Sequence, residues 1–396
     1  MKTMVNKVKD HLENCIIPFW KGLRDDEFGG YYGYLDYNLK LDKKAEKGCI
    51  LNSRILWFFS SAYLLLKDES LLHEADHAYA YMTKHCLDKE NGGIFWSTTY
   101  DGKVKDSTKH TYNQAFAIYA LSSYYEASGN PKALEKAEEL FYLIETKCKD
   151  EKGYLEASDR SFHKIDNDKL SENGVIADRT MNTLLHVLEA YTGLYSVWND
   201  NKVKNALKDI LNDFAEKVYN GSLHRQEVFF DDDYKSLIDL HSYGHDIETS
   251  WLVDRAVETL DEADRMWGER IHRITKDLAQ NILDTAFDGH SLPNECEAGK
   301  VDEKRIWWVQ AETVVGFLNA YNESGNSDER YLNASRSCLE FIFDNLVDKR
   351  EGSEWFWAVD GDGNPINGLP IVEPWKCPYH NGRMCIEVIR RMGYST

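Results

Sequence analysis

Two kinds of helical pattern alternate along the chain, and short aromatic segments with tight turns separate them. In the first kind, charged and apolar residues recur at the spacing of an amphipathic helix; in the second, most positions are apolar or small. The amphipathic pattern covers residues 5–20, 72–87, 131–147, 203–219, 263–283 and 328–347. The more apolar pattern covers residues 50–66, 112–127, 180–195, 245–260, 307–321 and 377–391. We therefore expect about twelve helices, alternately polar-faced and mostly apolar.

A glycine turn followed by aromatic or apolar residues recurs about every 60 to 70 residues, which indicates repeated supersecondary units. Glycine suits the tight reversal of the chain, and the residues after it predict a short strand. The six occurrences are Gly29-Gly30-Tyr31-Tyr32, Gly92-Gly93-Ile94-Phe95-Trp96, Gly153-Tyr154-Leu155, Gly221-Ser222-Leu223, Gly289-His290-Ser291-Leu292 and Gly352-Ser353-Glu354-Trp355-Phe356.

Apolar helices need an interior position, and amphipathic helices bury one face against them. The predicted fold is therefore all-α: an (α/α)6 barrel with short β-hairpins or strands in the connecting loops. An open solenoid of helix pairs would show the same pattern, but six units without polar terminal helices favour a closed ring. No linker rich in Pro, Gly or Ser divides the chain, so we expect residues 1–396 to form a single domain.

Residues that are unusual in a helical core gather at the starts of the apolar helices. In a closed ring these starts converge on the barrel axis, which predicts a deep pocket at one end of the barrel. The candidate pocket residues are Arg54, Tyr112, Asn182, His186, His245, Glu248, Trp307, Trp308, Glu312, Trp375 and His380.

The most informative stretch is His241-Ser242-Tyr243-Gly244-His245-Asp246-Ile247-Glu248. On a helix that begins here, His241, His245 and Glu248 share one face. A carboxylate one turn from an imidazole can orient the ring and raise its basicity, which suits proton transfer near neutral pH. Two structural interpretations also fit: helix-start histidines among capping neighbours, and a metal site shared by His at i and i+4. This stretch alone does not decide between the three.

The other candidates also have structural interpretations. Arg54 among apolar residues is compatible with a buried ion pair, and a single buried His186 with a hydrogen-bonded core histidine. One of Trp307 and Trp308 is expected to pack in the core, because successive helix residues point about 100° apart. His110 and His241 are candidates for supporting the pocket indirectly.

Composition narrows the function classes. The formal net charge of −20 argues against a nucleic acid or an anionic membrane as partner. Eight cysteines without a C-x-x-C pair favour reduced thiols, hence the cytoplasm, and we expect neither a signal peptide nor a transmembrane segment. The glycine motifs of phosphate and dinucleotide sites and the G-x-S-x-G motif of hydrolases are absent. The aromatic content of 13% is compatible with a packed core, and also with aromatic rings that stack on the faces of sugars.

Several motifs resemble those of the N-acylglucosamine 2-epimerase superfamily, and within it the cellobiose 2-epimerases, and the resemblance runs essentially end to end. The motifs are residues 241–248, Arg305-Ile306-Trp307-Trp308-Val309-Gln310-Ala311-Glu312, Trp375-Lys376-Cys377-Pro378-Tyr379-His380-Asn381-Gly382-Arg383, Asn52-Ser53-Arg54, Lys109-His110-Thr111-Tyr112-Asn113, Ser171-Glu172-Asn173-Gly174 and Met181-Asn182. The resemblance implies an (α/α)6 barrel with no cofactor and no metal. It also implies inversion of C2 at the reducing-end glucose of β-1,4-linked disaccharides, cellobiose and lactose, through an open-chain aldehyde and an enediolate.

The resemblance also implies roles for individual residues. The acid/base histidines fall on His245 and His380, and a third histidine, near the sugar ring oxygen, falls on His186. Arg54 takes the enediolate-side arginine and Glu248 the histidine-supporting glutamate. Sugar contacts fall on Tyr112, Ser171, Asn182, Trp308 and Trp375, and we add Trp307 and Glu312 to the expected sugar-binding surface.

Three other functions remain compatible with the sequence. One is a related monosaccharide enzyme, either an N-acylglucosamine 2-epimerase or a mannose isomerase that returns the proton to C1. Another is a glycoside hydrolase, which needs two carboxylates such as Glu248 and Glu312 across the scissile bond. The third is a non-catalytic carbohydrate-binding protein. The expected partner is a small disaccharide, without nucleic acid or membrane, and the expected state is a monomer.

Overall fold

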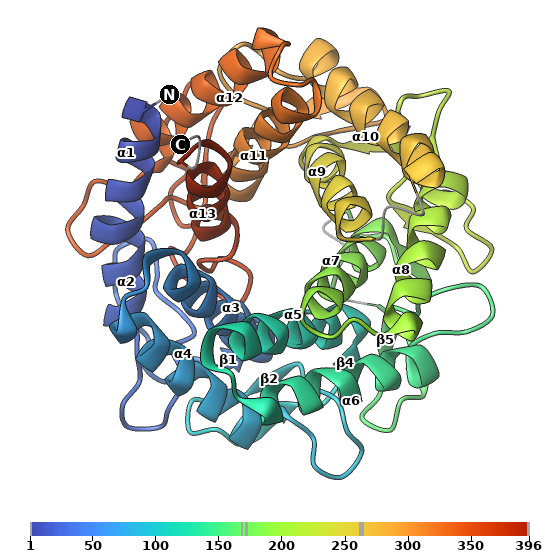
Figure 1. Cartoon of the computed structure of the whole chain (residues 1–396). Coiled ribbons are helices and arrows are strands. Elements are labelled where there is room, and N and C mark those ends of the chain that lie inside the picture. Colours follow the sequence, from blue (N-terminus) through green and yellow to red (C-terminus); the bar gives the residue numbers. More distant parts are fainter. Residues whose placement is uncertain (1, 168, 171–172, 261–264, 394–396) are drawn as a thin grey trace.

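The helices form two concentric rings in the computed structural model, which describes residues 2–167, 169–170, 173–260 and 265–393 (Figure 1). The inner helices are α3 (Cys49–Leu66), α5 (Thr111–Ser128), α7 (Met181–Val197), α9 (Tyr243–Thr259), α11 (Trp307–Glu323) and α13 (His380–Gly393). The outer helices are α1 (Lys2–His11) with η1 (Leu12–Ile16) and α2 (Ile17–Gly22), α4 (Glu69–Tyr81), α6 (Pro131–Lys147), α8 (Asn201–Asp213), α10 (Arg265–Thr285) and α12 (Glu329–Phe341).

The inner ring is closed. Each inner helix packs on the next one in chain order, and α13 packs against α3. Each outer helix packs beside an inner one, and α1 lies against α13, so that both ends of the chain meet at one side of the ring (Figure 1). This arrangement confirms the predicted (α/α)6 barrel.

Burial explains which helices lie inside. The outer helix α8 buries one stripe at the spacing of a helix face: Val203, Ala206, Leu207, Ile210 and Leu211. The inner helix α3 is buried at every position from Cys49 to Ala62. A helix that is apolar all round needs neighbours all round, and the inner ring supplies them.

The same helix α3 bears on the expectation that the chain has no transmembrane segment. By length and composition alone Cys49–Leu66 would qualify, with a mean hydropathy of 1.4. In the barrel, 78% of this segment is buried inside the protein. Its apolar character is therefore accounted for by the core.

Short antiparallel strands join successive units around one end of the barrel. The three-stranded sheets are β1 (Lys47–Gly48) with β2 (Ser97–Thr98) and β3 (Val104–Asp106), β4 (Lys109–His110) with β5 (Ala157–Ser158) and β6 (Lys164–Ile165), and β11 (Leu240–Ser242) with β12 (Glu295–Glu297) and β13 (Lys300–Asp302). The two-stranded pairs are β7 (Arg179–Thr180) with β10 (Phe229–Phe230), β8 (Tyr219–Asn220) with β9 (Arg225–Gln226), and β14 (Arg305–Ile306) with β15 (Ala358–Val359). A bridge between Leu35 and Val372 joins the first unit to the last.

Two helix starts and the ends of three outer helices differ in detail from the sequence-based expectation. His241 lies in β11, paired with Cys296, so the helix begins at Tyr243 and His241 does not share its face with His245. The last inner helix begins at His380 rather than at residue 377, because Pro378 disfavours a helical residue before it. Three outer helices end in π-helical turns, η2 (Met82–Cys86), η3 (Phe214–Val218) and η5 (Ile342–Leu346).

An ion pair with a buried lysine or arginine recurs where an outer helix connects to the next inner helix. An aspartate accepts hydrogen bonds from backbone N–H groups two and three residues later, and pairs with a buried base two residues before the inner helix. The pairs are Asp25 with Lys47, Asp88 with Lys109, Asp150 with Arg179, and Asp288 with Arg305. In the fourth unit, the one that carries His245, Asn220 makes the turn and His241 takes the place of the base.

We expect Lys47→Met to lower the free energy of unfolding by about 3–5 kcal/mol, because it leaves the Asp25 carboxylate buried without its cation. The Lys47 Nζ and Asp25 Oδ2 atoms are 2.6 Å apart, and both side chains are inaccessible. The exposed Lys152, which pairs with Asp232, is the matched control, and Lys152→Met should change stability by less than about 1 kcal/mol. Urea denaturation measures both, and equal losses would contradict the assignment.

Candidate active site

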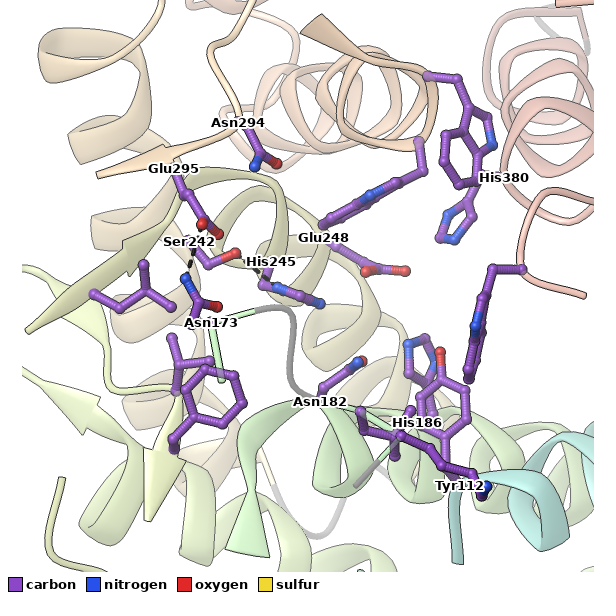
Figure 2. Close-up of a pocket in the computed structure, with 18 of the residues that line it drawn as sticks. Tyr112, Asn173, Asn182, His186, Ser242, His245, Glu248, Asn294, Glu295 and His380 are labelled. Atoms are coloured by element: carbon purple, nitrogen blue, oxygen red, sulfur yellow. Dashed lines mark hydrogen bonds between the residues drawn. The ribbon is translucent and has the colours of Figure 1, made fainter. Parts of the chain in front are cut away.

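A cavity of about 360 Å³ opens at the barrel end where the inner helices begin (Figure 2). Its wall includes ten of the residues predicted from the sequence: Arg54, Tyr112, Asn182, His186, His245, Glu248, Trp307, Trp308, Trp375 and His380. Ser171, the remaining predicted sugar contact besides Glu312, lies outside the described residues. The convergence expected from a closed ring is therefore present in the structure.

Helix geometry accounts for this convergence. Arg54, His186, Glu248 and Glu312 are each the sixth residue of their inner helix, one turn beyond its start. A residue at this position points toward the helix N-terminus, because Cα–Cβ bonds tilt that way. Equivalent positions on different inner helices thus aim at the same space.

His245 and His380 approach the cavity from different walls. His245 belongs to α9 and His380 to α13, and α11 lies between these helices in the ring. Trp308 of α11 contacts both imidazoles, with ring centroids 4.8 Å from His245 and 5.6 Å from His380. Figure 2 shows both rings pointing into the cavity, with the Glu248 carboxyl between them.

Two of the three cavity histidines are held by glutamates. Nδ1 of His186 lies 2.9 Å from Oε2 of Glu189, and Nδ1 of His380 lies 2.8 Å from Oε1 of Glu312. An ionised carboxylate only accepts, so Nδ1–H is the donor in each pair. The opposite nitrogen, Nε2, then carries the free lone pair that a base requires.

His245 is held differently. Its Nδ1 lies 2.7 Å from the hydroxyl oxygen of Ser242, the last residue of β11. The expected support of a histidine by Glu248 does not fit this geometry, because Glu248 hydrogen bonds to Arg383 instead. Spacing along one helix makes His245 and Glu248 neighbours, but the imidazole turns toward the strand.

Arg383 connects the carboxylates beneath the cavity. Its guanidinium is fully buried and donates to Glu189, Glu248 and Glu312, the last at 2.7 Å, and also to the Tyr379 hydroxyl. Glu312 accepts in addition from Trp251 and lies beneath His380. The expectation that Glu312 contacts the sugar therefore does not fit; its carboxylate positions His380.

Arg54 is a buried cation on the cavity wall. One guanidinium nitrogen donates to the Tyr112 hydroxyl at 2.8 Å and another to the backbone carbonyl of Trp375 at 3.3 Å. The guanidinium also lies over the rings of Phe116 and Tyr379. Among the described residues, no carboxylate pairs with it. The structural ion pair considered for Arg54 is thus not formed with any of these residues. The positive charge of the Arg54 guanidinium remains available to an anion in the cavity.

The cavity keeps the histidines neutral. Burial in the cavity, followed by the electrostatic effect of the neighbouring His186, lowers the pKa of His245 from 6.5 to about 3. Burial, followed by the charges of Arg383 and Arg54, holds the pKa of His380 well below its ordinary value. Burial also lowers the pKa of His186, although Glu189 opposes this. All three imidazoles are therefore unprotonated at neutral pH in the free protein.

Two groups of side chains in the described part of the chain are close enough to share a small cation. In the first, atoms of Glu248, Glu312 and His380 lie within 4.8 Å of one another, and the Arg383 guanidinium donates hydrogen bonds to both carboxyl groups. The second, Asp254, His272 and Glu323, borders a separate cavity. Both Asp254 oxygens there accept hydrogen bonds from neighbouring side chains.

Sequence reasoning missed Arg383, Glu189, Tyr379 and Ser242 as parts of this site. One signal was available: His186 and Glu189 have the same three-residue spacing as His245 and Glu248. The contacts of Arg383 carry no such signal, because they join residues up to 194 positions apart.

Comparisons with known proteins agree with this architecture. Residues 30–381 match the family description N-acylglucosamine 2-epimerase (GlcNAc 2-epimerase). The chain is 52% identical over 399 residues to a cellobiose 2-epimerase of Eubacterium cellulosolvens, covering 97% of each chain. A sugar epimerase from a ruminal bacterium, whose crystal structure is known, is 49% identical in sequence. The two structures match with a TM-score of 0.96, and the match covers 98% of this chain and 99% of that one. The chain is 45% identical to a cellobiose 2-epimerase structure from Bacillus thermoamylovorans, with a TM-score of 0.95 over 99% and 100%.

Proposed function

The chain belongs to the N-acylglucosamine 2-epimerase family, and on this premise we propose that it is a cellobiose 2-epimerase. As such it is an isomerase that inverts C2 of the reducing-end glucose of cellobiose and yields a mannose end. Lactose, which has the same reducing-end glucose, is the second proposed substrate, with epilactose as product. The reaction needs no net change of oxidation state.

One observation carries the proposal: two neutral imidazoles from different helices, His245 and His380, face one cavity beside Arg54, which pairs with no carboxylate in the described part of the chain. Inversion at a carbon requires that a proton leave one face and return to the other, which two bases on separate walls can do. The neutral imidazoles can each accept a proton. Arg54 offers the fixed charge that the intermediate needs.

The chemistry requires an open-chain sugar. C2 becomes acidic only beside a carbonyl group, so the pyranose ring must first open to the aldehyde. We assign His186, held by Glu189, to the ring oxygen side, where it assists opening. One of His245 and His380 then removes the C2 proton. The other takes up a proton from solvent and delivers it to the opposite face of C2, and the first base releases its proton to solvent.

Two features of the site stabilise the negative charge of the enediolate. Arg54 keeps its charge at any working pH and is almost fully buried, and a preorganised charge is most effective away from water. In addition, the positive ends of the inner helix dipoles point toward this end of the barrel. Both features favour an anionic intermediate over the neutral sugar.

The rest of the wall suits a carbohydrate. Trp308 and Trp375 are partly exposed to the cavity and present flat faces for sugar rings. The Asn182 side-chain oxygen and the Trp307 indole N–H have no hydrogen-bond partner among the described residues. These groups and the Tyr112 hydroxyl are the proposed partners for sugar hydroxyls, with Ser171 proposed from the sequence.

The proposed substrate is tested by incubating the protein with cellobiose, lactose, mannose and N-acetylmannosamine in parallel. We expect the two disaccharides to give C2 epimers at the highest rates. A ketose from mannose as the main product would favour a mannose isomerase, and faster turnover of N-acetylmannosamine would favour an N-acylglucosamine 2-epimerase. Free glucose from cellobiose would indicate a hydrolase, and binding without turnover would indicate a lectin-like role.

We expect activity to persist well below the ordinary histidine pKa of 6.5. The base must be neutral, and a lowered pKa keeps it neutral as the pH falls; His245, with a pKa of about 3, is protonated only in strong acid. The measurement is the pH profile of kcat/KM for cellobiose. An acid limb centred at or above pH 6.5 would contradict the assigned charge state.

The proposed location is the cytoplasm, which the eight free thiols support. The proposed partners are small disaccharides alone, and the proposed state is a monomer. Size-exclusion chromatography with light scattering tests the last point.

A further inference from the structure

Three buried carboxyl groups share a single guanidinium below the sugar cavity. Arg383 donates to Glu189, Glu248 and Glu312, and all four side chains are almost fully buried. If every carboxyl group were ionised while the histidines are neutral, the cluster would carry a net charge of minus two. Burying uncompensated charge is unfavourable, so at least one of these groups must hold a proton.

Hydrogen-bond donors identify which group holds it. Glu189 accepts from Arg383, His186 and Tyr379, and Glu312 accepts from Arg383, His380 and Trp251. Glu248 accepts from Arg383 alone, and among the described residues nothing donates to its other oxygen, Oε2. Donors stabilise an ionised carboxylate, so Glu248 is the least stabilised as an anion.

We propose that Glu248 is a protonated carboxylic acid in the resting protein and donates a hydrogen bond to the sugar oxygens at the reacting carbon. Arg383 is then a positioning residue, which keeps Glu189 and Glu312 ionised under their histidines and turns Glu248 toward the cavity. This inference deepens the proposed function and rests on it for the identity of the sugar.

The electrostatics of the cavity agree with a neutral Glu248. Burial, followed by the charge of Glu312, raises its pKa to about 8, against the opposing effect of Arg383. Burial raises the pKa of Glu312 as well, but Arg383 and Trp251 oppose this, whereas Arg383 and His186 hold the pKa of Glu189 below its usual range. The titratable and charged groups around Glu248 are Glu189, His186, Arg54, Tyr112, His245, Glu312, Tyr379, His380 and Arg383.

The position of Glu248 indicates what its proton does in the reaction. Its carboxyl lies between the rings of His245 and His380 on the cavity wall (Figure 2). It therefore faces the space in which C2 of the substrate must be held. An ionised carboxylate there would repel the enediolate. A carboxylic acid donates to the developing oxyanion instead and reinforces Arg54 from another side of the cavity.

The test is Glu248→Gln against the matched control Glu312→Gln. In Glu248→Gln the amide oxygen still accepts from Arg383, and the NH2 group donates to the sugar as the proposed acid does. We expect kcat/KM to fall by less than about tenfold, and the loss of activity above the pKa of about 8 to disappear from the pH profile. Glu312 accepts from three N–H groups, two at Oε1 and one at Oε2, so either amide orientation opposes at least one of them. We therefore expect Glu312→Gln to lose at least about a hundredfold in kcat/KM.

An infrared difference spectrum tests the proton without any turnover. Subtracting the spectrum of Glu248→Gln from that of the wild-type protein at neutral pH should reveal the C=O band of a protonated carboxyl that shifts in heavy water. The band should also be present if the protein acts on a different sugar, so this result is independent of the proposed substrate. A carboxylate band in its place, or a loss in Glu248→Gln as large as in Glu312→Gln, would overturn the proposal.

Discussion

His380→Asn should lower the rate of C2 epimerisation by about a thousandfold or more, while the protein remains folded. The imidazole of His380 is the only titratable group that α13 presents to the described cavity wall, and asparagine cannot take its proton. The amide is polar and smaller, so it fits beside Glu312 without burying a new charge. Circular dichroism and urea denaturation check the fold, and NMR of the cellobiose reaction measures epimerisation. The exposed His290, replaced by Asn, serves as control.

His245→Asn should have an equally large effect on epimerisation, and the pair of variants separates the two faces of C2. Each variant retains one base, which can still exchange the C2 proton of one epimer with solvent. We expect one variant to exchange the proton of cellobiose and the other that of glucosyl-mannose. An active His380→Asn or His245→Asn enzyme would remove the two-histidine account.

Arg54→Met should reduce kcat by about a hundredfold to a thousandfold and leave stability unchanged or higher. The loss follows from removal of the fixed charge beside the enediolate. The effect on stability has the opposite sign from that of an ion pair, because none of the described carboxylates pairs with the buried Arg54. A methionine fills similar space without a desolvation cost. Steady-state kinetics and urea denaturation measure the two effects. A marked loss of stability with little change in kcat would assign Arg54 to the structure of the barrel instead.

The fold was predictable because its signal is local and repeated six times. The run from Cys49 to Ala62 is buried throughout, and the stripe of α8 is buried on one side, as their patterns indicate. Closure of the ring then brings the helix starts together, which is why Arg54, His245 and His380 could be placed in one cavity. The exact starts were less predictable: His241 pairs with Cys296 of a hairpin that is distant in sequence.

The partners of the histidines were not predictable in the same way. Helical spacing makes Glu248 a neighbour of His245, but the side-chain conformation depends on Ser242 and on Arg383, which arrives from α13. Likewise, Glu312 is aimed into the barrel as expected, yet His380 and Trp251 cover it. Contacts between distant segments need the closed ring, and the sequence pattern contains no direct sign of them.

The most direct test of the central claim is the fate of the C2 hydrogen when cellobiose is incubated with the protein in heavy water. Two imidazoles on separate walls should give glucosyl-mannose that carries deuterium at C2 of the mannose residue and at no other carbon. NMR and mass spectrometry of the isolated product identify the sugar and the labelled position. Epimer that forms without deuterium, or cellobiose recovered unchanged and unlabelled, would contradict proton transfer by His245 and His380.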